Sequence, residues 1–352
     1  MASNQDRANS ASGSPLGRRE LLAYTATLGT TFLATQGLAR MPAATPAAAS
    51  AEGPAPKHYD MKKSINLWAF PYPQAWPLKK CFEIAKDAGF DGVEVNFALD
   101  GDISPEASAD DLKRIGDLAR EIGIEISGVC SFLFWPFALT SNDAGRRKRG
   151  LELAATMIAA AKALGTGNLL VVPGAVYIPW AKQGPPWPPA IEPVANDVCH
   201  ARATEAVRSL IPAAEKAGVY LNMENIFANG FLFSPEEMNR FVDQFDNPFV
   251  KIHFDTGNIM EYQFPEHWIP LLGKRIKNIH LKEFDKANAF NIDAFRTLLD
   301  GTTNWPAVLE ALDEIEYRGF LTFEYFHPFR HYPEALIYQT SDSLDRMLGR
   351  EA

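Results

Sequence analysis

Cysteine is scarce in this chain, with three residues among 352. Cys81, Cys130 and Cys199 are far apart in the sequence and odd in number, so no disulfide framework is expected. Long apolar runs are also missing: no segment reaches the ~20 apolar residues that cross a bilayer, and no membrane span is predicted. Hydrophobic residues nevertheless make up 47% of the chain, which is ample for a large buried core.

The first 51 residues have the composition of an export signal. Arg18 and Arg19 precede a weakly apolar stretch over 23–38 that is rich in Ala, Thr and Gly. Ala49-Ser50-Ala51 then resembles a small-residue cleavage site. We predict a twin-arginine-type signal peptide over 1–51, a linker over 52–62, and an exported or periplasmic protein. The alternative is a disordered tail with a chance arginine pair on a cytoplasmic protein.

Basic residues are in the minority, with 34 Lys and Arg against 43 Asp and Glu, a net formal charge of −9. Loss of residues 1–51 would remove four basic and two acidic residues and leave the remainder more acidic still. Because phosphate backbones attract basic surfaces, this balance disfavours nucleic acid as a partner. We therefore expect a small-molecule partner.

From residue 63 onward, strand-like and helix-like patterns alternate eight times. Expected strands cover 64–69, 92–97, 125–132, 168–172, 219–226, 249–255, 277–283 and 320–326. Expected helices cover 78–88, 109–122, 146–164, 197–217, 235–245, 266–272, 305–317 and 333–348. Eight such units on about 290 residues predict an α/β protein with a (β/α)8 TIM barrel over 63–350. A doubly wound sheet is the alternative, but no Gly-rich phosphate loop follows the first strand.

Two connections are unusually long for a compact domain. Residues 173–196 contain Trp180 and Trp187 and too many prolines for a helix. Residues 286–304 are predicted to hold a short Phe- and Leu-rich helix. Both connections follow strands, so both are expected on the face of the barrel where active sites are built.

Four strand patterns in the C-terminal half end in residue types that bind metal ions: Glu224, Asp255, His280 and Glu324. Because the carboxyl ends of barrel strands meet at one face, we expect their side chains to converge within about 3–5 Å of one another. Three carboxylates and one imidazole suit one divalent ion, Mn²⁺ in the first place, with Mg²⁺, Co²⁺ or Zn²⁺ as alternatives.

A second layer of polar residues lies two positions earlier on the same strands, and side chains two apart point the same way. Its members are Asn222, His253, Asn278 and Thr322. Buried polar groups need hydrogen bonds, so we expect this layer to orient the ligands above it. His253 is expected to be a hydrogen-bonded core histidine rather than a ligand.

Four further residues are predicted to bind substrate. Asn258 follows Asp255 by three positions and Lys282 follows His280 by two, so both are close enough to reach substrate hydroxyls. Glu94 ends the second strand, where a salt bridge at the rim is the alternative. Trp68 belongs to an aromatic set at the ends of strands one to three, which could provide an apolar wall for a sugar. The run 146–149 is interpreted as a solvated helix face, with phosphate binding as the alternative.

The motifs around these residues resemble those of the xylose-isomerase-like barrel superfamily of sugar and sugar-phosphate isomerases and epimerases. The similarity covers about 63–348 and is greatest to the ketopentose-phosphate 3-epimerase branch. It rests on four segments: Met223-Glu224-Asn225, Phe254-Asp255-Thr256-Gly257-Asn258, Ile279-His280-Leu281-Lys282-Glu283 and Thr322-Phe323-Glu324.

This resemblance implies that Glu224, Asp255, His280 and Glu324 bind one divalent metal, and that the two Glu also move protons at the epimerised carbon. The chain departs from the family at two positions. Asn258 stands where the family has a substrate-contacting His, and Gly230 stands where sugar 3-epimerases have a second Glu. The sugar, and whether it is phosphorylated, therefore stay open.

The predicted activity is a metal-dependent sugar or sugar-phosphate isomerisation or epimerisation through an enediolate, with the two Glu as catalytic acid and base. Since they come from strands five and eight, we expect them to lie well apart, across the metal.

The alternative is an exported metal-dependent lyase or hydrolase acting on 3-keto-sugars or 3-keto-glycosides. The scarcity of His, seven in all, disfavours the phosphodiesterase branch of the superfamily. A non-catalytic sugar-binding barrel is disfavoured by the two acids beside the metal. An exposed helical layer is compatible with a homo-oligomer.

Overall fold

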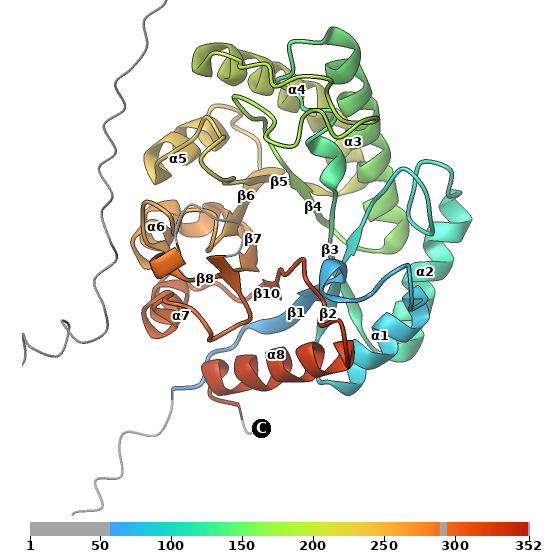
Figure 1. Cartoon of the computed structure of the whole chain (residues 1–352), viewed down its shortest axis with the longest axis vertical. Coiled ribbons are helices and arrows are strands. Elements are labelled where there is room, and N and C mark those ends of the chain that lie inside the picture. Colours follow the sequence, from blue (N-terminus) through green and yellow to red (C-terminus); the bar gives the residue numbers. More distant parts are fainter. Residues whose placement is uncertain (1–56, 289–293, 351–352) are drawn as a thin grey trace, which may run out of the picture. The chain divides into compact units, whose positions relative to one another are not determined.

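The computed structural model describes residues 57–288 and 294–350, in which eight parallel strands close into a barrel (Figure 1). The order around it is β1-β10-β7-β6-β5-β4-β3-β2, so each strand lies beside its neighbours in the sequence. The strands are β1 (Lys62–Asn66), β2 (Gly92–Asn96), β3 (Glu125–Cys130), β4 (Asn168–Val171), β5 (Tyr220–Glu224), β6 (Val250–Asp255), β7 (Ile276–Leu281) and β10 (Phe320–Phe323). The predicted TIM barrel is confirmed. The predicted signal peptide lies outside the described residues.

Helices form an outer ring around the strands (Figure 1). They are α1 (Leu78–Asp87), α2 (Ala109–Ile122), α3 (Ala144–Leu164), α4 (Asn196–Ala217), α5 (Pro235–Asp243), α6 (Pro265–Leu272), α7 (Trp305–Glu314) and α8 (Pro333–Leu348). None of the helices in the described ranges is long and apolar enough to span a bilayer.

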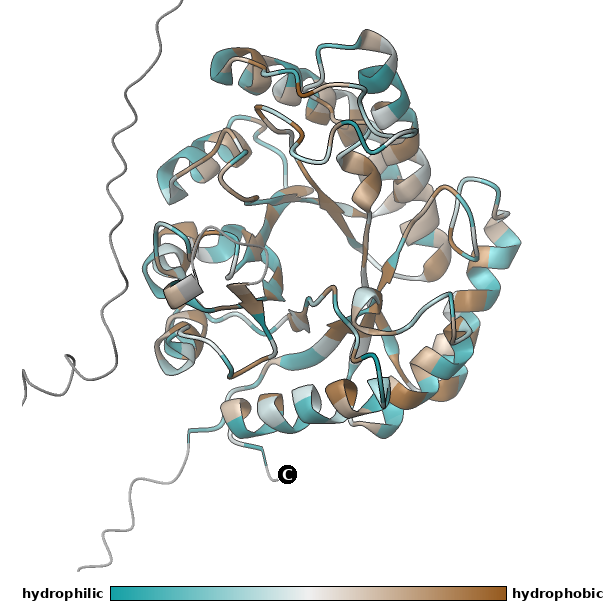
Figure 2. Cartoon of the chain, in the orientation of Figure 1, coloured by the Kyte–Doolittle hydropathy of each residue, from teal (hydrophilic) through white to brown (hydrophobic). Residues whose placement is uncertain are grey.

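The strands form from apolar segments that are buried, and the helices begin and end at residues that cap them. The strands are buried on both faces and colour mainly as hydrophobic in Figure 2, as expected when helices cover a parallel sheet. At the start of α2, Ser108 accepts the backbone N–H of Asp111, whose carboxylate accepts the N–H of Ser108 in return. Gly123 ends that helix in the left-handed conformation that glycine adopts without strain.

Most strands end earlier than predicted, and at two of them a polar side chain starts a 3₁₀ turn. Asn66 accepts the backbone N–H of Trp68, so β1 gives way to a turn over Leu67–Ala69. Ser131 accepts the N–H of Leu133 in the same way and starts the turn Phe132–Phe134 after β3. These turns place Trp68 and Phe132 at the mouth of the barrel, with their ring centroids 4.9 Å apart.

The connection after β7 differs from the prediction. The described part begins with one 3₁₀ turn, Lys286–Asn288, but its Phe295–Arg296 segment forms a strand, β9, which pairs antiparallel with β8 (Glu283–Phe284). Residues 289–293 lie outside the description. The buried carboxylate of Glu283 fastens this connection, because it accepts the indole N–H of Trp305 at 2.6 Å and the backbone N–H groups of Leu299 and Thr303.

Candidate metal and active site

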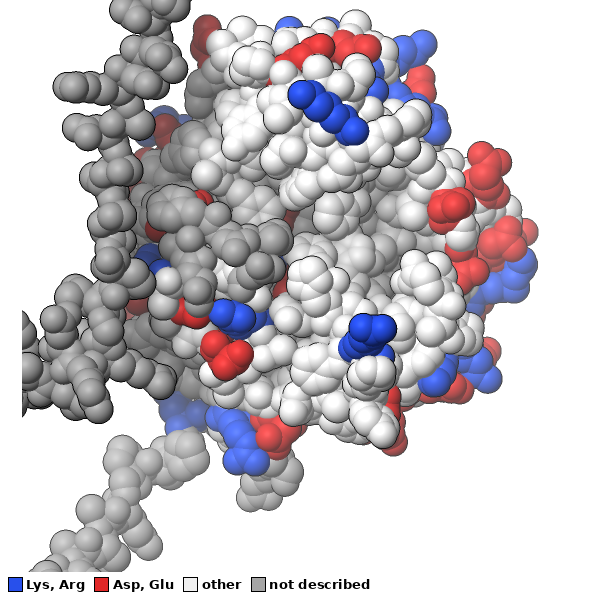
Figure 3. Space-filling model, in the orientation of Figure 1, with Lys and Arg blue, Asp and Glu red and all other residues white. Residues whose placement is uncertain are grey.

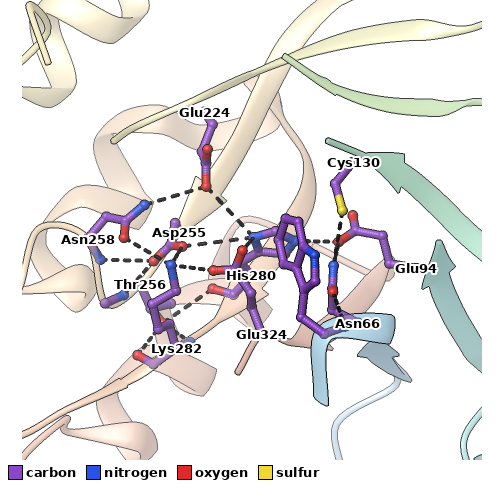
Figure 4. A network of polar contacts seen from close by, with 12 residues as sticks. Asn66, Glu94, Cys130, Glu224, Asp255, Thr256, Asn258, His280, Lys282 and Glu324 are labelled. Carbon is purple, nitrogen blue, oxygen red and sulfur yellow. Dashed lines mark hydrogen bonds and ion pairs between the residues drawn. The ribbon is translucent and has the colours of Figure 1, made fainter. Parts of the chain in front are cut away.

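Glu224, Asp255, His280 and Glu324 converge at the carboxyl end of four adjacent strands (Figure 4). One potential ligand atom from each lies within 4.8 Å of those of the other three, so the predicted convergence is confirmed. His280 Nδ1 lies 3.8 Å from Glu224 Oε1, 3.9 Å from Asp255 Oδ2 and 3.4 Å from Glu324 Oε1. The two Glu were expected well apart. Their strands are separated by β6 and β7, but their side chains lean toward the same point.

Glu94 holds the other side of the His280 ring. Its Oε2 lies 2.6 Å from His280 Nε2 and accepts Asn66 Nδ2 at 2.6 Å, with all three side chains fully buried. The space for this carboxylate exists because residue 128 on β3 is glycine: a Cβ there would lie 3.2 Å from Glu94 Oε1. Glu94 was predicted to contact substrate, but it lies behind His280 and does not line the cavity described below. A carboxylate there fixes the imidazole with Nδ1 directed at the cluster.

Asp255 is positioned by its own loop. Its Oδ1 accepts the backbone N–H groups of Gly257 and Asn258 at 2.8 and 2.9 Å, which leaves Oδ2 facing the other three ligands. Asn225 exchanges two hydrogen bonds with the Asp255 backbone. The sequence interpretation did not single out Asn225, although a polar residue directly after Glu224 at a strand end was the available signal.

Lys282 and Asn258 connect the ligands. Lys282 Nζ forms ion pairs with Asp255 Oδ2 at 2.9 Å and with Glu324 Oε2, and it donates to Asn258 Oδ1 at 3.1 Å. The amide of Asn258 in turn donates to Glu224 Oε1 at 3.4 Å. Both residues are almost fully buried and line the cavity described below, and their contact with substrate stays a prediction.

Burial and charge shift the titration of this cluster. Burial raises the pKa of Glu324 to about 7 and also raises the pKa of Glu224. Burial alone would lower the pKa of His280, but the charges of Glu94 and Glu324 raise it well above its usual value. The pKa of Lys282 is raised by Asp255 and Glu324 against the opposing effect of burial. Without a metal the buried cluster therefore tends to retain protons, which a bound cation would have to displace.

The deeper polar layer is buried as predicted, but its hydrogen bonds are not those expected. Within the described residues, neither ring nitrogen of His253 has a hydrogen-bond partner, nor do the amide of Asn278 and the hydroxyl of Thr322. His253 packs edge-on against His280, with centroids 4.1 Å apart, and burial lowers its pKa well below the usual value. His253 thus touches the cluster by packing, whereas the polar contacts of the cluster come from Glu94, Lys282 and the loop after β6.

A cavity of about 510 Å³ opens above the cluster. Glu224 and Glu324 line it, whereas Asp255 and His280 lie beneath and are wholly buried. Trp68, predicted as an apolar wall, also lines it. So do Trp180 and Trp187, which places the long 173–196 connection on this face as predicted. Arg146, from the basic run, fastens that connection by donating to the carbonyl oxygens of Pro186 and Trp187.

The residues present fit a divalent cation. His280 Nδ1, Asp255 Oδ2 and Glu324 Oε2 have no hydrogen-bond partner among the described residues, although Lys282 forms ion pairs with the two oxygens. Buried polar atoms are normally hydrogen-bonded, so an unpartnered imidazole nitrogen that faces three carboxylates is characteristic of a cation site. Three carboxylates and one imidazole suit a hard to borderline divalent ion. Binding would require His280 Nδ1 to be unprotonated.

Known structures share this fold. The chain resembles L-ribulose 3-epimerase, with a TM-score of 0.66 and 19% identity over 82% of this chain and 94% of that one. It resembles a D-psicose 3-epimerase, with a TM-score of 0.65 and 20% identity over 82% and 100%. It also resembles 3-keto-D-glucoside 4-epimerase from E. coli, with a TM-score of 0.62 and 18% identity over 82% and 97%.

No curated protein sequence matches the chain. The family described as xylose isomerase-like TIM barrel matches residues 82–346, which is most of the sequence and includes all four residues of the cluster. The chain therefore belongs to the xylose isomerase-like TIM barrel family.

Proposed function

We propose that this protein is a divalent-metal-dependent sugar isomerase or epimerase that moves a proton at a carbon next to a carbonyl. One observation carries the proposal: among the four clustered residues, Glu224 and Glu324 both join the cluster and line the cavity, whereas Asp255 and His280 do not reach the cavity. A residue that binds a cation and also reaches substrate can act as acid or base. A residue shielded from substrate can serve only as a ligand.

The roles follow from these positions. One of Glu224 and Glu324 removes the proton and the other returns one to the opposite side. A bound Mn²⁺, Mg²⁺, Co²⁺ or Zn²⁺ ion would supply Lewis-acid stabilisation of the negative charge that develops on the substrate oxygens. Lys282 and Asn258 donate hydrogen bonds toward the same region and orient the sugar. Glu94 keeps His280 directed at the cluster.

The cavity favours an unphosphorylated sugar over the ketopentose phosphates suggested by the motifs. Among the described residues that line it, Lys282 and His327 are the basic ones, and Lys282 is already paired with two carboxylates. A phosphate there would lack the arginine fork or lysine cluster that binds such groups. An exported location, proposed from the arginine pair, agrees with this because sugar phosphates are mostly intracellular.

A second candidate is a lyase or hydrolase acting on 3-keto-sugars or 3-keto-glycosides. The name of one structural neighbour, 3-keto-D-glucoside 4-epimerase, places this substrate type on the same fold. The apolar part of the cavity favours it too, because that part offers room for a leaving group. Removal of the proton at C2 would form a C1–C2 double bond, break the C1–O bond and release the leaving group, which takes up a proton.

Deuterium exchange in D₂O tests the proposal. The full-length protein with Mn²⁺ is incubated with free ketoses, ketose phosphates and 3-keto-glycosides, and exchange at the carbon next to the carbonyl is followed by NMR. Glu224→Gln and Glu324→Gln should each lower turnover about 10²-fold or more. Each should lose less metal than Asp255→Ala. Glu205→Gln, on the exposed side of α4, is the matched control. Full activity in either Gln variant with metal bound would remove that Glu from the mechanism.

A further inference from the structure

The part of the cavity farther from the cluster is lined by aromatic rings, which we call the aromatic chamber. Its rings come from the mouths of β1, β3 and β10 and from the long connection after β4: Trp68, Phe132, Trp135, Trp180, Trp187 and Phe326. Trp135 and Trp180 pack edge to face with ring centroids 5.0 Å apart, whereas the rings of Trp180 and Trp187 are tilted by 57° with centroids 6.0 Å apart. Charged side chains are mostly at the periphery of the face seen in Figure 3, and its centre is largely uncharged.

The two hydroxyl groups of the chamber lining are already engaged. Ser131 Oγ donates to the backbone oxygen of Phe97 at 2.7 Å, and Tyr72 Oη donates to Asp102 at 3.0 Å. The other polar side chains of the lining that lie away from the cluster, Gln74, Gln183 and His327, are exposed at the mouth. A free sugar placed there would meet mainly ring faces and indole N–H groups, which donate but do not accept, and hydroxyl hydrogens buried without an acceptor are costly.

Lys282 lies between the aromatic chamber and the part of the cavity next to the four clustered residues. Its ammonium pairs with the carboxylates on one side and lies 5.2 and 5.1 Å from the ring centroids of Phe227 and Phe295, and 5.2 Å from that of Phe326. A ligand spanning this boundary would present hydroxyls to Lys282, Asn258 and the two Glu, and an apolar surface to the rings. A volume of about 510 Å³ lies within the range of pockets for drug-sized ligands.

From the contrast between the polar and the aromatic parts of the cavity, we propose that the substrate is a glycoside. Its sugar would lie against Glu224, Glu324, Lys282 and Asn258, and a flat, apolar aglycone would lie in the aromatic chamber. The inference rests on the proposed function for the chemistry at the sugar, and adds the substrate class. Half-buried rings such as Trp180 and Trp187, and Phe132 at 37% exposed, would be covered by the aglycone.

The test compares substrates that share one sugar. Phenyl and methyl 3-keto-β-D-glucopyranoside and free 3-keto-D-glucose are offered to the full-length protein with Mn²⁺ in D₂O, and kcat/KM is measured for exchange next to the carbonyl. Burial of a phenyl ring predicts a preference of about tenfold or more for the phenyl glycoside over the methyl glycoside. Trp180→Ala should reduce that ratio about fivefold. Tyr332→Ala, an aromatic residue outside the cavity that is 77% exposed, should leave the ratio unchanged.

A binding measurement separates the two proposals. Quenching of tryptophan fluorescence by phenyl and methyl β-D-glucopyranoside reports on the chamber without requiring turnover. Exchange with equal kcat/KM for the phenyl and methyl substrates would overturn the glycoside inference and leave the proposed function standing. Absence of exchange with every sugar would overturn the proposed function. If phenyl glucoside then also bound no more tightly than methyl glucoside, the chamber assignment would be refuted independently.

Discussion

Glu94→Gln should weaken metal binding without touching a metal ligand. The Glu94 carboxylate accepts His280 Nε2–H and Asn66 Nδ2–H, both at 2.6 Å, in a fully buried setting. Glutamine keeps the size of the side chain but removes its charge, so the imidazole loses the partner that makes Nδ1 a better donor. Loss of such a partner typically costs 10–100-fold in metal affinity, or about 1.4–2.7 kcal/mol. Alanine would be a poorer choice, because two buried donors would be left unpaired at about 1–3 kcal/mol each.

The assay is a Mn²⁺ titration in competition with a chromophoric chelator, beside turnover measured with saturating metal. We expect a weaker apparent Kd and turnover that recovers substantially when metal is added in excess. Glu125→Gln is the matched control, since that carboxylate is exposed and pairs with Lys62 away from the cluster. Wild-type metal affinity combined with lost turnover would refute the positioning role and return Glu94 to the substrate contact that the sequence suggested.

Three further outcomes are expected. Chelation with EDTA should lower the Tm, because an ion held at 100 times its Kd stabilises the fold by about 2.7 kcal/mol; identical melting curves with and without Mn²⁺ would contradict a metal site in the folded protein. Lys282→Met should lower turnover about 10–100-fold through loss of a charged hydrogen bond, yet bind Mn²⁺ at least as tightly, since a competing cation is gone; weaker binding by metal titration would disprove that competition. Gly257→Ala should lower the free energy of unfolding in urea by about 1–3 kcal/mol, because the added Cβ would lie 2.7 Å from the Lys282 carbonyl oxygen. An unchanged urea midpoint would show that the loop moves freely aside.

The sequence predicts the barrel and the ligand cluster for the same reason. Buried strands are short apolar runs, and a polar residue that ends such a run is conspicuous, so Glu224 and Asp255 could be identified from their segments alone. The barrel topology then brings those ends to one face without any further information. Strand ends were less well predicted where a side chain such as Asn66 starts a turn, because an apolar residue in a 3₁₀ turn looks like one more strand residue.

The position of Glu94 could not be predicted, because it depends on register between strands. Glu94 on β2 pairs with Asn66 on β1 and with Gly128 on β3, and its side chain crosses the barrel to reach His280 on β7. Sequence periodicity says that a strand residue points inward but does not say which residue it meets. The aromatic chamber could not be predicted from the sequence for a related reason. Trp180 lies in an irregular connection, and no periodic sequence pattern defines the path of such a connection.

The proposed division of roles within the cluster is argued from side-chain length together with local hydrogen bonding. Asp255 is short, and one of its oxygens is saturated by two backbone N–H groups of the loop that follows it, so a single oxygen is left for a cation. Glu224 and Glu324 are longer by one methylene and have no such loop, and their carboxylates extend past the buried layer into the cavity. A carboxylate with an oxygen held by the main chain cannot swing toward substrate, whereas one fixed only by Lys282 or Asn258 can exchange partners during a proton transfer. These differences support the proposed division between an acid that only binds the metal and acids that also react.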